Sequence, residues 1–445
     1  MRSTREQRAW YWYDWANSAF YTTTATVLIS PYLVSLASTA ACPDATGDAT
    51  CTNPVLLLGL FPVLPGALPS LLATLSTLVS AVVLLFIGAA ADRSAHPHRW
   101  LGATAWLGAA AGSLMFLLMG SDWELGAWLM VISLLAFGAS IVVYDSMLVR
   151  IAGPDERDRV SSRGWAWGYV GGGLLLAINF AMMTFYDDLG ITKGMAVRLC
   201  LLSAGLWWAG FTFIPVLGLR RLPRDVPAEV AHRNPFRQLA ATFAEMRHYP
   251  QTLAFLLAFL FYNDGIQTVI VSASVYASRE LRIDDNLVLA TFLLTQFVAI
   301  LGALGFGRVA AVIGAKKTVL VGIVIWLAVV LVGFLIPSGV VGALFGLGAA
   351  IGLVMGGTQA LSRSMYSQLI PLGRESEYFS FYQAMERGTS WLGTLTFGLV
   401  FQFTQSYRLA LIALVAFFVV GGILLARVDM RKGIIDAGNV LPKVL

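Results

Sequence analysis

Twelve apolar stretches recur along the chain, and each is about long enough to cross a bilayer as a helix. A chain with this many long apolar segments is a membrane protein, so we predict an all-α fold with twelve transmembrane helices. The predicted spans are 11–36, 68–91, 100–120, 125–148, 163–186, 195–219, 253–275, 288–311, 318–336, 339–361, 378–403 and 408–427.

The basic residues lie almost entirely on one side of these spans. When the loops are numbered from the N-terminus, only five of the 30 Lys and Arg residues fall in the even set. Loops rich in Lys and Arg stay in the cytoplasm, so the odd loops and both termini should be cytoplasmic. We expect a multi-pass protein of the cell inner (plasma) membrane. The five basic residues of the even set are Lys193, Arg198, Arg279, Arg282 and Arg408.

Composition narrows the classes of partner. With 58% hydrophobic and 12% charged residues, the chain has too little polar surface for a water-soluble globule. The net charge of +5 is explained by inner loops that face anionic lipid, so the bilayer is the expected partner and nucleic acid is not. Cys42 and Cys51 share the first outward loop and could form a disulfide or remain free thiols.

The twelve spans form two groups of six, and one long loop separates the groups. The break at 220–252 is rich in Arg and Pro, as expected of a linker between two bundles. We predict an N-terminal six-helix bundle at 1–219, a cytoplasmic linker at 220–252, and a C-terminal bundle with a short cytoplasmic tail at 253–445. Within the linker, the apolar spacing at 236–249 predicts a short amphipathic helix on the inner membrane surface.

A short repeat supports an internal duplication of the two halves. GAAADRSAH at 88–96 follows the second span, and GRVAAVIGAKK at 307–317 follows the eighth. Both resemble the loop signature of the major facilitator superfamily, although the second copy lacks its acid. By that resemblance Asp92, with Arg93, would latch an inner gate by pairing with a helix N-terminus or with an Arg such as Arg150. A turn residue in a solvated loop is the alternative for Asp92.

Few ionisable side chains interrupt the spans. Insertion of each such side chain near the bilayer centre costs roughly 2.5 to 3.5 kcal/mol on insertion scales. Each is therefore expected to have a structural or functional role. Asp264 is the deepest, because it lies on the order of 20 Å along a helix that starts at Pro250. Gly265 follows it and could allow a local break, which often marks a binding site in transporters. A substrate or proton role for Asp264 competes with simple hydrogen bonding to neighbouring spans.

Asp14 and Asp145 lie nearer the inner ends of spans 1 and 4. Asp14 comes six residues after Arg8, so a helix N-cap or first-turn position is the alternative to a place on the transport path. Asp145 could pair with Arg150 or Arg163 near the inner mouth.

Glu386 and Arg387 are adjacent in span 11. Neighbouring residues point to different faces of a helix, so these two side chains cannot simply neutralise each other. We expect one of them to pair with the other bundle.

Four motifs together resemble one family. They are YDWANSAF at 13–20, GWAWGYVGG at 164–172, FYNDGIQT at 261–268 and GGTQALSRS at 356–364. They are similar to the signatures of the vacuole-effluxer-like permeases, a branch of the major facilitator superfamily that includes the autophagy-related vacuolar amino-acid exporter of fungi. The resemblance runs from span 1 to span 11. It implies two pseudo-symmetric six-helix bundles that work by alternating access, with amino-acid efflux known for fungal members.

These observations predict a secondary active transporter of a small polar solute, such as an amino acid or a related metabolite. Proton coupling through Asp264 or Glu386 is a hypothesis. The sequence has no phosphate-binding Gly-x-x-x-x-Gly-Lys-Ser/Thr loop, so energy should come from gradients. We expect a monomer without cofactor or metal. The candidate substrate or proton-coupling residues are Asp14, Asn17, Tyr21, Asp145, Trp165, Tyr262, Asn263, Asp264, Gln267, Gln359, Arg363, Glu386 and Arg387.

Two other classes of function fit the sequence less well. A membrane enzyme would need a catalytic constellation, but the sequence has no His-Glu-x-x-His, Cys-x-x-Cys or Gly-x-Ser-x-Gly motif, so we expect no enzyme. A non-transporting membrane scaffold or sensor with the same fold is the alternative function. Such a scaffold would not need charged side chains on the path helices, and Asp264 and Glu386 argue against it.

Overall fold

The N-terminal half begins with an unusually long helical span. In the computed structural model of the chain, which describes residues 3–43, 51, 53–222, 242, 244–388 and 391–445, helical structure is continuous from Arg5 to Ala41. A π-helical segment interrupts its α-helical geometry at Tyr21–Leu28, where three successive threonines stand. β-branched residues crowd the preceding turn of an α-helix, and wide π turns often accompany functional sites. The elements of this span are α1 (Arg5–Phe20), η1 (Tyr21–Leu28) and α2 (Ile29–Ala41).

A small β-hairpin follows α2 and is the one departure from the all-α prediction among the described residues. Its strands β1 (Val55–Leu57) and β2 (Phe61–Val63) pair antiparallel, with Val55 opposite Val63. The structure joins Cys42 to Cys51 by a disulfide, which closes the segment between α2 and the hairpin.

The other helices of this half are spans with short helical caps. They are η2 (Pro65–Ala67), α3 (Leu68–Asp92), α4 (Pro97–Leu114), η3 (Met115–Leu117), α5 (Trp123–Ser146), α6 (Leu148–Ile151), η4 (Pro154–Glu156), α7 (Arg157–Thr184) and α8 (Lys193–Gly218).

The C-terminal half repeats this plan. Its elements are α11 (Pro250–Val275), η5 (Tyr276–Glu280), α12 (Asp285–Ile313), α13 (Ala315–Leu335), α14 (Val341–Gln368), α15 (Glu375–Gly388), α16 (Trp391–Thr404), α17 (Tyr407–Ala413), α18 (Val415–Arg427) and α19 (Met430–Asp436).

The structure is consistent with the predicted number of spans. Among the described residues, eleven helices are long and apolar enough to cross a membrane. The predicted span at 378–403 is covered by α15, up to Gly388, and α16, from Trp391, and the two residues between them lie outside the described part of the chain. Near the start of α16, the Gly393 N–H donates to the Asp264 carboxylate of α11 at 2.7 Å. A side chain from another helix thus satisfies this backbone donor.

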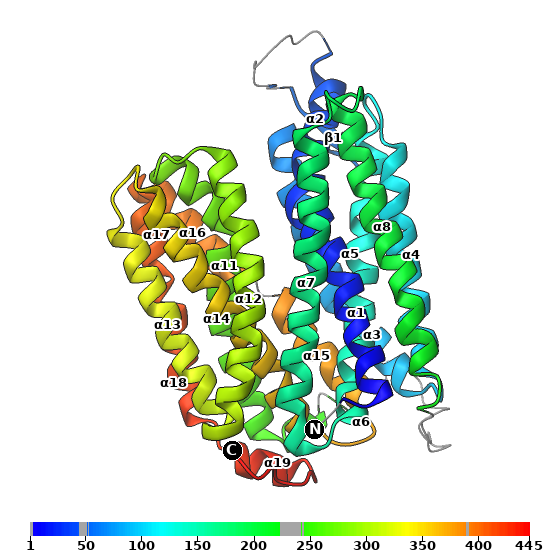
Figure 1. The fold of residues 1–445 in the computed structure, drawn as a ribbon, viewed down its shortest axis with the longest axis vertical. Helices are drawn as coiled ribbons and strands as arrows, with labels where there is room; N and C mark the ends of the chain where they lie inside the picture. Colours follow the sequence, from blue (N-terminus) through cyan, green and yellow to red (C-terminus); the bar gives the residue numbers. More distant parts are fainter. Residues whose placement is uncertain (1–2, 44–50, 52, 223–241, 243, 389–390) are drawn as a thin grey trace.

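The two halves form separate cores. The largest cluster of buried apolar residues is drawn from positions 246–434, and the next two from positions 9–222. The two groups of helices lie apart at the end that carries α2 and β1 and meet at the end that carries both termini (Figure 1). Most of the predicted linker and half of the predicted amphipathic helix at 236–249 lie outside the described residues, so the domain boundaries at 219 and 253 remain a proposal.

Glycines set how closely α12 and α14 pack. A Cβ at Gly356 of α14 would overlap the carbonyl oxygen of Ala299 on α12, whereas a Cβ at Gly346 of the same helix would meet nothing within 4 Å. Small residues of this kind let membrane helices approach backbone to backbone. The close approach of α12 therefore requires glycine at position 356 but not at position 346.

The substitution Gly356→Ala tests this packing. We expect it to destabilise the protein by about 1 to 3 kcal/mol, because a backbone carbonyl cannot move aside as a flexible side chain can. Gly346→Ala is the matched control and should be neutral or stabilising by up to about 1 kcal/mol, since Ala favours helix over Gly. Thermal unfolding of the two purified variants makes the measurement, and equal melting temperatures would contradict the packing account.

Candidate functional site

A buried arginine joins the two halves of the molecule. Arg363 lies near the C-terminal end of α14 and is 3% exposed. Its guanidinium forms ion pairs with Asp14 of α1 at 3.3 Å and with Asp145 of α5 at 3.1 Å. The arginine belongs to the C-terminal half and both aspartates to the N-terminal half, so these pairs hold the halves together.

Neutral groups complete the hydrogen bonding of this cluster. The Arg363 Nε donates to the hydroxyl of Ser161 at 2.9 Å, and its Nη2 donates to the Ser161 carbonyl at 3.1 Å. The Tyr144 hydroxyl donates to Asp14 at 2.7 Å. Buried ion pairs offset their desolvation cost only when further hydrogen bonds of this kind satisfy the remaining donors and acceptors.

Aromatic rings surround the guanidinium. Its central carbon lies 4.7 Å from the ring centre of Trp10 and 5.5 Å from those of Tyr144 and Trp165. Trp10 also stacks on Tyr144, with ring centres 4.3 Å apart. Desolvated cation–π contacts of this type are worth about 2 kcal/mol, so the rings help to retain a charge away from water.

Among the described side chains of this cluster, the acids outnumber the cations. The amide of Gln383 on α15 donates to Asp145 at 3.1 Å and to Glu386 at 3.0 Å. Gln383 therefore links the ion-paired aspartate to a third carboxyl, which is half-buried. Because like charges repel strongly where the effective dielectric is low, such a site favours binding of a proton or of a cationic group.

A second contact between the halves fixes the start of α15. The two oxygens of Asp92 accept hydrogen bonds from the backbone N–H groups of Ser376 and Glu377, at 3.0 and 2.7 Å. A carboxylate at a helix N-terminus is stabilised by the helix dipole. Gly88 lies one turn before Asp92 on α3, and a Cβ at this position would overlap the Ser376 carbonyl oxygen. The glycine therefore lets α15 approach α3 closely. The sequence suggested a helix N-terminus or an arginine as the partner of Asp92, and the structure pairs it with the helix N-terminus.

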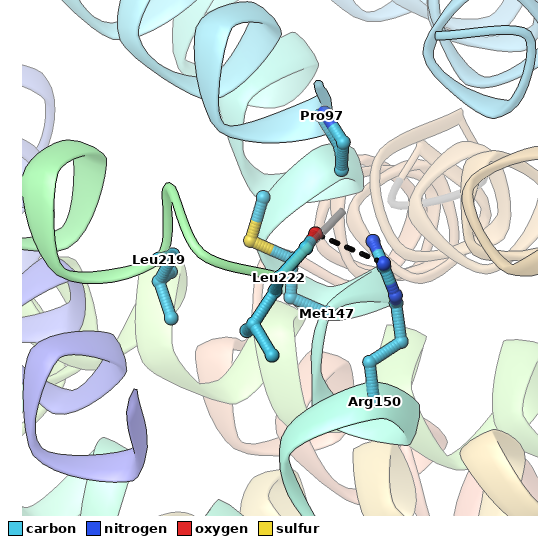
Figure 2. Close-up of a pocket in the computed structure, with 5 residues that line it drawn as sticks. All are labelled: Pro97, Met147, Arg150, Leu219 and Leu222. Carbon is cyan, nitrogen blue, oxygen red and sulfur yellow. Dashed lines mark hydrogen bonds between the residues drawn. The ribbon is translucent and has the colours of Figure 1, made fainter. Parts of the chain in front are cut away.

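Arg150 forms a contact within its own half. Its guanidinium donates to the carbonyl oxygen of Leu222 at 3.0 Å, beside Met147 and Pro97 (Figure 2). This bond ties the short helix α6 to the segment that follows α8. Arg93 is half-buried at the end of α3.

Further hydrogen bonds between the halves cluster at the same end of the molecule. Arg157 of α7 donates to the Ser367 carbonyl at 2.7 Å, and Ser364 donates to Asp158 at 2.6 Å. The Ser161 hydroxyl donates to the carbonyl of Ala360 at 2.6 Å. The predicted topology places this end in the cytoplasm. Because the two halves are in contact here, the structure is closed at its predicted cytoplasmic end.

Polar contacts also lie inside the C-terminal half. Tyr262 and Ser362 share a hydrogen bond of 2.7 Å, and the Gln359 amide donates to Asn263 at 3.0 Å. Asp264 accepts from the Gly393 backbone, as described above. These bonds join α11 to α14 and α16, apart from the Arg363 cluster.

Three interpretations made from the sequence are wrong. Asp14 is not a helix cap, because Thr4 caps α1 and Asp14 is buried in the helix interior. The cation paired with Asp145 is Arg363, not Arg150 or Arg163. Gly265 does not break α11, which is continuous there, and instead gives space to the ring of Phe418.

Other candidates lie outside the cluster. The Asn17 amide donates to the Tyr13 carbonyl of its own helix at 2.8 Å. Tyr21 is 42% exposed within η1 and stacks on Phe137. Gln267 is half-buried on α11, and the side chain of Arg387 lies outside the described residues.

Sequence reasoning missed Tyr144, Ser161 and Gln383, which complete the charged cluster. Tyr144 and Gln383 each lie within three residues of a predicted site residue, and this proximity was a usable signal. Ser161 had no signal, because a serine at the start of a span is ordinary.

The chain is similar to known proteins over nearly its whole length. The family described as vacuole effluxer Atg22 like matches residues 2–438. An uncharacterized MFS-type transporter, YxiO, of Bacillus subtilis (strain 168) is 27% identical over 96% of this chain and 95% of its own. Autophagy-related protein 22-1 of Phaeosphaeria nodorum is 24% identical over 98% of this chain and 92% of its own. The protein of that name from Neosartorya fischeri is 29% identical, and the match covers 63% of this chain and 49% of the relative.

Solved structures give the same fold. A bacterial homologue of the iron transporter ferroportin has a TM-score of 0.68 at 12% identity, over 95% of this chain and 99% of that one. The major facilitator superfamily transporter FucP has a TM-score of 0.66 at 13% identity, over 95% and 98% of the two chains. At these identities the likeness establishes the fold alone.

Removal of the central cation should open the closed end. In Arg363→Met, Asp14 and Asp145 lose their cation, and an unpaired buried charge costs about 3 to 5 kcal/mol, so water should enter between the halves. A cysteine at the fully buried Ala360, in a Cys200→Ser background, reports this opening through its rate of thiol labelling. We expect at least an approximately tenfold faster rate, which corresponds to about 1.4 kcal/mol.

Arg408→Gln is the matched control, because Arg408 pairs with Glu280 inside the C-terminal half. It should leave the labelling rate unchanged. Equal rates in the Arg363→Met variant and the parent would show that this cluster does not hold the halves together.

Proposed function

This chain belongs to the Atg22-like vacuole effluxer family of major facilitator transporters, and on that basis we propose that it moves a small polar solute, such as an amino acid, by proton-coupled alternating access. Its family and fold are those of integral, multi-pass membrane transporters and not of enzymes. The substrate, the coupling ion and the membrane are the parts that we propose.

The Arg363 cluster is the observation that carries the mechanism. Alternating access requires contacts between the halves that form at one end and break when that end opens. Arg363, Asp14 and Asp145 meet these requirements, because they come from both halves and are buried where the halves touch. When the inner end opens, water hydrates all three groups, which limits the cost of breaking the ion pairs. Two states of similar free energy can therefore exchange.

The chemistry of the cluster suits a zwitterionic solute. An arginine and two aspartates on the inner part of the path provide partners for a carboxylate and for an ammonium group. The names of relatives support export as the direction, since the family is described as vacuole effluxers. An amino acid or a related metabolite is therefore the proposed substrate class.

The excess of acids supports coupling to protons. A proton on Asp145, or on Glu386 linked to it through Gln383, would weaken the attraction between Arg363 and the N-terminal half. Proton binding would then favour opening of the inner end. We further propose that Asp92 acts as a latch of this inner gate through the N-terminus of α15, and that it separates from α15 during opening.

The loop charges support a location in the cell membrane with both termini in the cytoplasm. We propose that one chain is the working unit, because each half supplies part of the cluster described above.

Transport by purified protein in liposomes tests the proposal. We expect accumulation of one or more labelled amino acids when a pH gradient is imposed, and loss of that accumulation when a protonophore collapses the gradient. Arg363→Met should reduce flux at least about tenfold, because one interaction worth about 1.4 kcal/mol changes a rate by that factor. Arg408→Gln should retain the flux.

Each component of the proposal can fail separately. Flux that ignores the gradient would remove proton coupling, and flux of another solute class alone would remove the amino-acid assignment. Full flux in Arg363→Met would remove the cluster as the inner gate. No flux of any solute, with preserved binding of a partner protein, would favour the membrane scaffold or sensor instead.

A further inference from the structure

The first span changes its helical geometry partway along its length. At the end of η1, the backbone N–H of Ile29 donates to the carbonyl of Thr24, five residues earlier, as in a π-helix. Among the described residues, the other π-helical segment is η5, which ends the first span of the C-terminal half. Helix α2, by contrast, continues the first span beyond η1. A change of geometry in η1 would therefore reorient a whole helix.

Two threonine hydroxyls of η1 are buried without a hydrogen-bond partner in the described part of the chain. They belong to Thr23, which is fully buried, and to Thr24, which is 1% exposed. A buried hydroxyl group without a partner destabilises the conformation that contains it. The π-helical form of η1 therefore carries a free-energy cost that a form with partners for these hydroxyls would lack.

An α-helical form of η1 would supply those partners. In an α-helix a threonine hydroxyl can donate to the carbonyl four residues earlier, as the fully buried Thr212 of α8 does to Trp208 at 2.7 Å. The wide turns of η1 shift the carbonyls, and the exposed Thr26 accordingly donates to Tyr21, five residues earlier, at 3.2 Å. In α geometry, both unpartnered hydroxyls would reach carbonyls in the last turn of α1.

The same conversion would turn α2. A π turn contains more residues than an α turn, so the eight residues of η1 span more rotation and more length when they are α-helical. In the structure, Tyr32 of α2 donates to the Leu118 carbonyl at 2.7 Å, and Leu33 occupies the space that Gly126 of α5 leaves free. These contacts hold the present orientation of α2. Because α2 lies at the end where the halves stand apart, its rotation acts where the outer end must close (Figure 1).

A helix of the other half holds the start of η1. The amide of Gln296 on α12 donates to the hydroxyl of Thr22 at 3.3 Å. Gly172 of α7 leaves room for this contact, since a Cβ there would lie 3.0 Å from the Thr22 hydroxyl oxygen. Because the bond crosses between the halves, a rocking motion of one half against the other would break it. The geometry of η1 is thus linked to the relative position of the halves.

We infer that η1 is a conformational switch, π-helical while the inner end is closed and α-helical when it opens, and that its conversion turns α2 to close the outer end. This inference rests on the proposed alternating access. The contacts of Thr22 and of α2 favour the π form, whereas the hydrogen bonds gained by Thr23 and Thr24 favour the α form. Such opposing contributions allow both forms to be populated.

Substitution of the unpartnered hydroxyls tests the switch. Thr23→Val combined with Thr24→Val removes hydrogen bonds that only the α form makes, while Val keeps the β-branching of Thr. In Ala360→Cys, Cys200→Ser protein, we expect thiol labelling at the inner end to slow at least about fivefold, because one hydrogen bond changes an equilibrium by roughly that factor. Thr212→Val is the matched control and should keep the rate, since its hydrogen bond lies within α8 in both forms.

A distance measurement follows α2 itself. Spin labels on Thr39→Cys of α2 and Leu125→Cys of α5, both exposed positions, report the rotation by double electron–electron resonance in Cys200→Ser protein. We expect the parent to show mainly the distance of the structure, and Arg363→Met, with its opened inner end, to populate a second distance. Addition of the two valine substitutions to Arg363→Met should reduce this second population.

Two results would overturn the inference. One is a labelling rate that the paired valine substitutions leave unchanged, or that Thr212→Val lowers equally. The other is a spin-label distance that stays the same while labelling shows the inner end open, since α2 would then not turn. The valine variant should also melt at a higher temperature than the parent, because it removes unpartnered hydroxyls, so loss of folding is not expected to obscure the test.

The experiments separate this inference from the proposed function. A second distance that depends on Thr23 and Thr24, in a protein that transports no solute, would refute the function and leave a switch of another use. Transport at the parental rate in the paired valine variant, with one spin-label distance throughout, would refute the inference alone. If both hold, the paired valine variant should transport at least about fivefold more slowly than the parent, and Thr212→Val should not.

Discussion

The buried charge of Arg363 is the constraint on which the junction of the two halves depends. A guanidinium 3% exposed within a membrane protein must be paired, and its two carboxylates come from helices of the other half. The surrounding rings and the Ser161 backbone complete its environment. Apolar packing alone would not specify how the halves meet, since lipid can cover an apolar surface equally well. The ion pairs make one relative position of the halves much more favourable than nearby ones.

Span 11 connects this junction to the interior of the C-terminal half. Its first helix, α15, begins on Asp92 and contributes Gln383 to the charged cluster, whereas its second helix, α16, begins on Asp264. Asp264 thus provides a buried polar contact between α11 and α16 inside the C-terminal half.

Much of the architecture and some of the site could be predicted from the sequence. The apolar segments and the four motifs predicted the membrane-spanning fold and the family, because these features depend on local composition and short spacing. Asp14, Asp145 and Arg363 were all recognised as candidates, since each is a costly charge in an apolar segment. Their pairing was not recognised. Arg363 is more than 200 residues from both aspartates, and the nearer arginines of the inner loops were the more obvious partners.

The sequence by itself determined that this chain spans a membrane many times and which charged residues require an explanation. Each of these follows from the free energy of placing a given side chain in hydrocarbon or in water, whatever its neighbours are. Only the tertiary structure decided that Arg363 pairs with Asp14 and Asp145, that Gly265 leaves α11 intact, and that Asp264 and Thr268 meet at the start of α16. These outcomes depend on distances between helices that are far apart in sequence, and helix packing alone sets such distances.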